Sequence, residues 1–255
     1  MTSPTPIQLI MLPGIATDRR LFAAQRARFP ELIVPEWPRW DDASGDAQSF
    51  AAWCWEAWTV GGGRCIDSEQ PFILSGTSSG GLVALELAWL AQQLGKPPAA
   101  VLLISSCRNW QAVPRWYGRW SDWSSRLPRW LVKQWFVSRH VTRSLRSESA
   151  DRATAELVEA MYQSSDWDEL QRWARCLATW RREESELESA HFPVHQLHGR
   201  LDSLFPKPSP KQATLLLDAG HWMTATHAQS VNNWIEAIVR DLTLKRRGPS
   251  SPSRP

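Results

Sequence analysis

The sequence predicts an α/β protein with a mainly parallel central sheet, flanked by helices, and an inserted helical cap. Short apolar runs of strand character alternate with helix-like stretches, and this alternation is typical of a parallel sheet covered on both faces. The alternation stops at Cys107 and resumes near Pro193, and the stretch between them is helix-prone. We therefore expect a discontinuous core of residues 1–106 and 191–244 and a helical cap at residues 107–190.

The first part of the chain holds four predicted strands, which are short apolar runs bounded by turn residues: Ile7–Leu12, Leu32–Val34, Phe72–Leu74 and Ala100–Ser105. Predicted helices separate them. The first helix is expected to run from a cap at Thr17 or Asp18 to Phe29. The second follows Ser49, its expected N-cap, and shows apolar residues on one helical face. The third covers Leu82–Gln93.

Beyond the cap, we expect strands at Val194–Leu197 and Thr214–Leu217 and a closing helix at Gln229–Leu242. Residues 245–255 contain Pro, Ser and basic side chains but nothing to bury, which predicts a disordered basic tail. The formal net charge is +3, and it becomes −1 when the four Lys and Arg residues of this tail are left out. The charge therefore does not support nucleic-acid binding.

The composition is that of a soluble globular protein, with 43% hydrophobic and 22% charged residues. No run approaches the ~18 apolar residues of a transmembrane helix, and the N-terminal apolar run lacks the basic residues of a signal peptide. The four cysteines are isolated in the sequence, so we expect neither a zinc site nor a disulfide framework. A reducing cytoplasm is the expected location.

The stretch Gly76-Thr77-Ser78-Ser79-Gly80 matches G-x-S-x-G, the nucleophile elbow between a strand and a helix. A phosphate-binding P-loop would need a lysine after the glycines, and a flexible linker would not join a strand to a helix directly. Only Ser78 has glycines two residues away on both sides. Side chains at those positions would collide in so tight a turn, so Ser78 is the predicted nucleophile.

A serine nucleophile needs a histidine base and an orienting carboxylate, which follow it along the chain in the order acid, then histidine. Asp202 and His221 both lie just after predicted strands, at the edge of the sheet where ligands bind in such folds. Asp218 is the rival acid, and His227 is the rival base. We expect Asp202 and His221 to complete the triad.

An oxyanion hole requires two backbone N–H groups. The Ser79 amide would lie at the start of a helix, where the helix dipole favours negative charge. The second donor is expected in the loop after the first strand, where Gly14 allows the turn and the Ile15 N–H would point into the site. The Ile15 assignment depends on its position alone, because every residue type except proline carries this donor.

Four segments together resemble the α/β-hydrolase superfamily: LPGIATDRRLF, LSGTSSGG, LHGRLDSLFP and AGHWMTATH. The chain is most similar to small capped carboxylesterases, a group that includes methyl-ester esterases acting on acyl carrier proteins. The resemblance implies Ser78, Asp202 and His221 as the triad, with no cofactor. The comparison also predicts departures: we expect the family's first two antiparallel strands to be missing, and Pro13 stands where many relatives have a histidine. These departures affect the expected substrate class more than the expected catalysis.

The predicted cap is rich in tryptophan and arginine. Trp116 and Trp120 would share one helix face, and nine Lys and Arg residues lie within residues 108–146. Three interpretations remain open. The tryptophans form the core of the cap, or they line an acyl pocket whose arginines face an acidic acyl carrier or a coenzyme A thioester, or they lie on a lipid surface. Trp222, beside His221, is a separate candidate for the pocket wall.

The sequence thus predicts a serine hydrolase that cleaves a small-molecule or acyl ester, or a thioester, through an acyl-enzyme. No metal or other cofactor is required. Two alternatives remain open: an acyltransferase that uses the same triad, and a non-catalytic binding protein with this fold.

Overall fold

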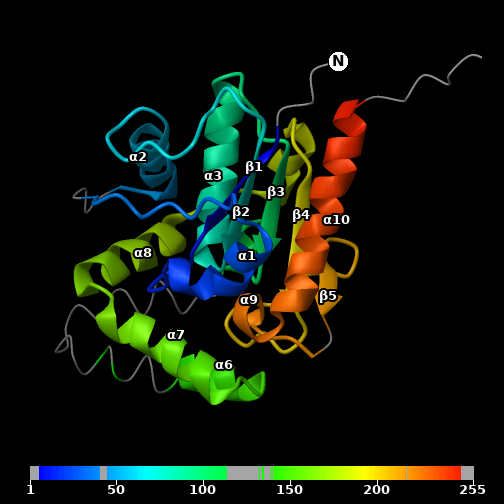
Figure 1. The fold of residues 1–255 in the computed structure, drawn as a ribbon. Helices are drawn as coiled ribbons and strands as arrows, with labels where there is room; N and C mark the ends of the chain where they lie inside the picture. Colours follow the sequence, from blue (N-terminus) through cyan, green and yellow to red (C-terminus); the bar gives the residue numbers. More distant parts are fainter. Residues whose placement is uncertain are drawn as a thin grey trace, which may run out of the picture.

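The computed structural model describes residues 6–40, 45–113, 132, 134, 139, 141–216 and 218–247. Its centre is a single parallel sheet in the order β1-β2-β3-β4-β5 (Figure 1). The strands are β1 (Gln8–Leu12), β2 (Phe72–Thr77), β3 (Ala100–Ile104), β4 (Val194–Gly199) and β5 (Thr214–Leu216). Every residue of β2 and β3 is buried, as expected for strands covered on both faces. The predicted fold class is confirmed.

The strand expected at Leu32–Val34 is reduced to one bridge. Ile33 pairs with Ile10, and its N–H donates to the Leu9 carbonyl at 2.9 Å. Pro30 and Pro35 flank this segment, and proline has no N–H with which to continue a ladder. The segment therefore lies along the outer edge of β1 without forming a strand.

Helices cover both sides of the sheet. The predicted ones are present with shifted ends: η1 (Arg19–Phe22), α1 (Ala23–Arg28), α2 (Ala47–Thr59), α3 (Ser79–Gln93) and α10 (Ala228–Arg247). The short helix α9 (Met223–Thr226), which we did not predict, precedes α10. Helices α2 and α3 pack together on one side, and α1 packs with α9 and α10 on the other (Figure 1). The N-cap of α2 is Asp46, which accepts the Ser49 N–H at 2.9 Å, so Ser49 is not the cap. Residues 245–247 belong to α10, although we expected them in the disordered tail.

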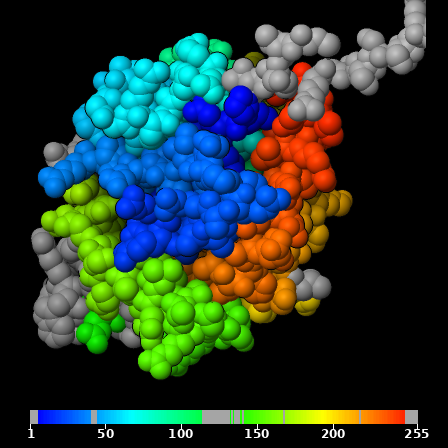
Figure 2. All heavy atoms as spheres, viewed as in Figure 1, coloured from blue at the N-terminus to red at the C-terminus, as the bar shows by residue number. Residues whose placement is uncertain are grey.

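Between β3 and β4, the described residues form helices: η2 (Trp110–Ala112), α6 (Thr142–Ser147), α7 (Arg152–Ser164), α8 (Trp167–Thr179) and η4 (Glu184–Ser189). Figure 1 shows α6, α7 and α8 together at one end of the sheet. In Figure 2 this green segment lies against the blue N-terminal segment and the orange segment before α10. We call residues 107–190 the cap. Trp116 and Trp120 lie outside the described residues.

The exit of the cap is attached to the core by a buried ion pair. The Glu86 side chain on α3 is 3% exposed, and its Oε2 lies 2.6 Å from Nη2 of Arg182. Trp180 donates its indole N–H to Glu86 Oε1 at 2.7 Å. The carboxylate therefore has both a cation and a neutral donor, as a buried charge requires.

None of the helices in the described part of the chain combines the length and the apolar character needed to span a bilayer.

Candidate active site

Ser78 lies at the turn from β2 into α3, with φ +53° and ψ −128°. This left-handed backbone is unfavourable for a residue with a side chain, so the surrounding structure has to hold it in place. Two hydrogen bonds do so. The Ser78 N–H donates to the Ile104 carbonyl at 3.1 Å, and the Ser106 hydroxyl donates to the Ser78 carbonyl at 2.6 Å.

The glycines on either side of Ser78 allow the close approach that the sequence predicts. A Cβ on Gly76 would lie 2.2 Å from the Gly80 carbonyl oxygen. A Cβ on Gly80 would lie 2.4 Å from the Pro13 carbonyl oxygen. Both distances are far below van der Waals contact, so no other residue fits at either position without moving the backbone.

Asp202 and His221 come together although 19 residues separate them. Asp202 lies after β4 and His221 lies before α9, and Oδ2 of Asp202 is 2.9 Å from Nδ1 of His221. The other oxygen, Oδ1, accepts the N–H groups of Leu204 and Phe205 at 2.8 and 2.9 Å. The ring of Phe205 stacks on His221 with an interplanar angle of 6°. The carboxylate and the imidazole ring are therefore fixed in orientation.

Burial and pairing act in opposite directions on the pKa values of this pair. Burial alone would raise the pKa of Asp202, but the charge and hydrogen bond of His221 outweigh it and hold the pKa below its ordinary value. Burial alone would lower the pKa of His221, but Asp202, together with Glu148, raises it. This pairing favours a charged imidazolium beside a carboxylate.

A second histidine, His198, lies behind the pair. Its side chain is fully buried, and its Nε2 is 3.5 Å from Asp202 Oδ2. Burial lowers the pKa of His198, with Asp202 offsetting part of the effect. We therefore expect a neutral His198 that packs beside Asp202.

The two rival residues contact each other instead. Asp218 is exposed, with Oδ2 3.6 Å from Nε2 of His227. His227 also contacts the Thr226 hydroxyl through Nδ1 at 2.9 Å. Asp202, not Asp218, is the carboxylate bonded to His221.

Ser78 and His221 line one small cavity, along with Tyr162 from α7 and with Trp222. Its volume is about 10 Å³, which is room for about one water molecule. Trp222 is 3% exposed, and its ring meets His221 edge-on at 5.2 Å between centroids. The residue expected to form the pocket wall thus lines the cavity that holds Ser78.

The expected oxyanion donors are adjacent, but one of them has a partner that we did not predict. The Ile15 N–H donates to the side-chain hydroxyl of Ser79 at 2.7 Å. As the first residue of α3, Ser79 has a backbone N–H without an intrahelical partner. Ser79 therefore contributes a hydroxyl contact in addition to its expected backbone N–H. The Ile15 N–H could bind an oxyanion only after its hydrogen bond to this hydroxyl is broken.

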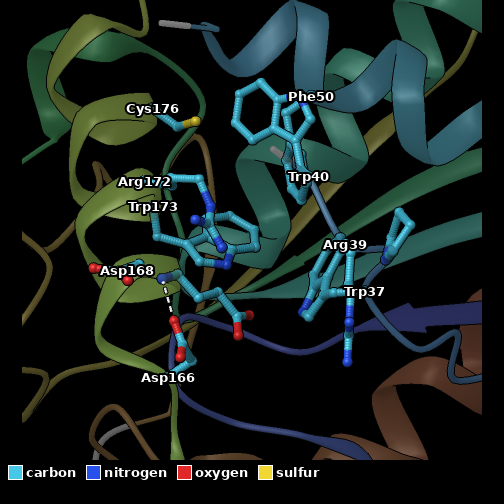
Figure 3. Close-up of a pocket in the computed structure, with 11 residues that line it drawn as sticks. Trp37, Arg39, Trp40, Phe50, Asp166, Asp168, Arg172, Trp173 and Cys176 are labelled. Carbon is cyan, nitrogen blue, oxygen red and sulfur yellow. Dashed lines mark hydrogen bonds between the residues drawn. The ribbon is translucent and has the colours of Figure 1, made fainter. Parts of the chain in front are cut away.

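A separate aromatic cleft lies between the segment before α2 and helix α8 (Figure 3). Its volume is about 370 Å³. Trp37, Trp40, Phe50 and Trp173 form its walls, and neighbouring ring centroids are 4.8–5.5 Å apart. Sequence reasoning missed this cleft, because Trp173 lies far along the chain from the other three rings. Within the described ranges, no group of three or more His, Cys, Asp or Glu side chains could hold a metal ion.

The fold and the elbow geometry are those of an α/β hydrolase. A family model described as the alpha/beta hydrolase family matches residues 9–234. The chain therefore belongs to the alpha/beta hydrolase family, which confirms the resemblance inferred from its four segments and supports a hydrolase as the class of protein. The comparison with curated proteins gives no match.

Solved structures with the same fold include a thermophilic esterase from Thermogutta terrifontis, with 17% identity, a TM-score of 0.67, and coverage of 94% of this chain and 92% of the other. MenH from S. aureus is 14% identical with a TM-score of 0.72, covering 93% and 95%. The type II thioesterase YbtT of the yersiniabactin pathway is 14% identical with a TM-score of 0.59, covering 95% and 96%. At these identities the similarity establishes the fold.

Proposed function

We propose that the protein is a serine hydrolase that cleaves carboxylic esters or thioesters with Ser78, His221 and Asp202 as its triad. The observation that supports this most is the hydrogen bond between Asp202 Oδ2 and His221 Nδ1, together with the cavity that His221 shares with Ser78. A carboxylate on Nδ1 fixes the tautomer in which Nε2 is free to accept a proton.

In the proposed reaction, the Ser78 hydroxyl oxygen attacks the carbonyl carbon while His221 Nε2 takes its proton. The negative charge on the carbonyl oxygen is stabilised by the Ser79 and Ile15 N–H groups, once Ile15 has left the Ser79 hydroxyl. The imidazolium then gives its proton to the departing alcohol or thiol, which leaves an acyl-serine. Water, deprotonated by His221, attacks this ester, and the carboxylic acid leaves as Ser78 regains its proton.

A fluorophosphonate probe tests this assignment without a known substrate, because it reacts with activated serines. We expect wild-type protein to be labelled and Ser78→Ala to remain unlabelled. Ser75→Ala is the matched control, since Ser75 is another buried serine and lies three residues earlier, on β2. Asp202→Asn should slow labelling by about 10⁴-fold, as expected for a histidine in the wrong tautomer. If folded wild-type protein is not labelled, the proposal is wrong and the non-catalytic alternative holds.

A second experiment tests the substrate class. Hydrolysis of p-nitrophenyl esters of increasing chain length, and of matched thioesters, reports how much acyl chain the site accepts. Addition of an alcohol or amine separates hydrolysis from acyl transfer, because only a transferase forms the new ester or amide in preference to the acid. The acidic-carrier interpretation depends on the basic residues of 108–146, and one of these, Arg108, already pairs with Glu184 at 2.8 Å.

A further inference from the structure

A second buried carboxylate, Glu148 of the cap, contacts the turn that carries His221. The backbone N–H of Trp222 donates to both of its oxygens, at 2.9 Å to Oε1 and 3.1 Å to Oε2. The Thr226 hydroxyl lies 3.1 Å from Oε2. Glu148 is 5% exposed and comes 74 residues before Trp222, so this contact joins the cap to the catalytic turn.

The end of α6 holds Glu148 in place. Glu148 is the C-cap residue, and Ser149 follows it with φ +52°. The Ser149 N–H bonds to the Arg146 carbonyl at 3.2 Å, and the Ala150 N–H bonds to the Leu145 carbonyl at 3.1 Å. This pair of bonds is a Schellman motif with serine where glycine is usual. The two hydrogen bonds hold Ser149 in this unfavourable backbone conformation, so the backbone directly after Glu148 is fixed.

Glu148 also packs on the residue before His221. A Cβ on Gly220 would lie 2.3 Å from Cγ of Glu148. Glu148 therefore contacts the backbone on both sides of His221, at residues 220 and 222. Trp222 is held a second time from α6, because its indole N–H donates to the Ser144 hydroxyl at 2.7 Å.

Among the residues that the structure describes, no basic side chain forms a hydrogen bond or ion pair with Glu148. Burial raises the pKa of Glu148, and the Trp222 amide, His221 and Thr226 offset only part of this effect. Asp202 faces it from the loop after β4, and His227 lies beyond Thr226. The helices that pack nearby also carry Tyr162 on α7, whose pKa burial raises, and the exposed Arg143 and Arg146 on α6.

We propose that Glu148 is a positioning residue for the base. It holds the His221 turn through the Trp222 amide, and its charge stabilises the protonated form of His221 that arises during the reaction. The base is thus served by two carboxylates, Asp202 from the core and Glu148 from the cap. This inference rests on the proposed serine hydrolase function.

The test is the pH dependence of fluorophosphonate labelling in Glu148→Gln, which keeps an oxygen acceptor for Trp222 but removes the charge. Labelling needs neutral His221, so its rate rises with pH through the pKa of His221. Glu148 raises that pKa, so the variant should reach its plateau at lower pH. We expect the midpoint to move down by roughly half a pH unit or more and the plateau rate to fall about tenfold. A structural defect alone would lower the rate at every pH without moving the midpoint.

Two matched variants control the experiment. Glu156→Gln removes an equal charge from the exposed face of α7, and Ser149→Gly relaxes the turn beside Glu148; both should keep the wild-type midpoint. If Glu148→Gln fails to fold, Thr226→Val replaces it, because removing a donor to Oε2 makes the carboxylate harder to ionise and should shift the midpoint in the same direction. A wild-type midpoint in Glu148→Gln, or in Thr226→Val where that variant replaces it, overturns the inference. Absence of labelling in wild-type protein would instead overturn the proposed function.

Discussion

The cap joins the core through two buried carboxylates, Glu86 and Glu148, and they differ in what balances their charge. Glu86 is bonded to the guanidinium of Arg182 and to the Trp180 indole N–H. Glu148 is bonded to a backbone amide and lies near a hydroxyl, and the ionisable group beside its contacts is His221. A carboxylate paired with a cation holds two segments together. Glu148 has no such cation among the described residues, and its charge acts instead on His221, whose pKa it raises.

The largest expected effect comes from breaking the ion pair between Glu86 and Arg182. Arg182→Ala leaves Glu86 buried without its cation, which should lower the free energy of unfolding by about 3 kcal/mol. Chemical denaturation measures this loss. The neighbouring Arg181→Ala is the control, because Arg181 bonds to backbone carbonyls near the surface and should cost well under half as much. In folded Arg182→Ala protein, the pH midpoint of fluorophosphonate labelling should remain that of wild type. A shifted midpoint would mean that Glu86 and Glu148 do not differ as described.

The second effect concerns the contact between Glu148 and the backbone beside His221. Gly220→Ala places a methyl group against Glu148 and should lower the free energy of unfolding by about 2 kcal/mol while slowing fluorophosphonate labelling. Adding Glu148→Ala removes the clash, so the double variant should be more stable than the sum of the two single losses predicts. Gly62→Ala is the control, since a Cβ there meets no atom within 4 Å. Strict additivity of the two changes would contradict the contact.

A third contact joins two uncharged groups, the N–H of Ile15 and the hydroxyl of Ser79, which belong to the two proposed oxyanion donors. Ser79→Ala removes the acceptor of the Ile15 N–H and should cost about 1 kcal/mol of stability, because a buried donor is left unpaired. The labelling rate should rise a few-fold, since the reaction no longer begins by breaking this bond. Denaturation and labelling kinetics on the same preparation test both. A slower variant would show that the hydroxyl assists the reaction directly.

The smallest effect is a change of stability with pH. The pKa of Glu148 is raised in the folded protein, so the folded state holds this proton more tightly than the unfolded state does. The contribution of Glu148 to stability is therefore most favourable below its unfolded pKa, near 4.5, and declines as the pH rises through its folded value. Relative to wild type, Glu148→Gln should become more stable between pH 4 and pH 8. Denaturation curves across this range test the trend, and a constant difference would contradict it.

The features that could be predicted from the sequence are those that depend on a local pattern or on the order of residues along the chain. The elbow at Ser78 was predictable because its glycines lie at a fixed spacing, and the structure has the close contacts that explain them. The contact between Asp202 and His221 was predictable because both follow strands of one parallel sheet. Their catalytic roles remain proposals.

Other features depend on contacts between distant segments, which one sequence does not reveal. Glu148 is one of many acids in the second half of the cap, and nothing near it in the sequence indicates that it reaches Trp222. The sequence assigned a role to the Ser79 amide only, because the bond between its hydroxyl and the Ile15 N–H spans 64 residues and leaves no local pattern. The segment Leu32–Val34 has the composition of a strand, yet the prolines at its ends prevent a ladder.

The contact between Glu148 of the cap and the turn that carries His221 has a consequence for protein engineering. Caps of this kind invite exchange between scaffolds, on the assumption that they alter only which molecules enter. Here a chimera that replaced residues 107–190 would also remove a carboxylate from the surroundings of His221. If His221 acts as proposed, the resulting protein would have a weaker base, unless the grafted segment supplied an acid at the same place.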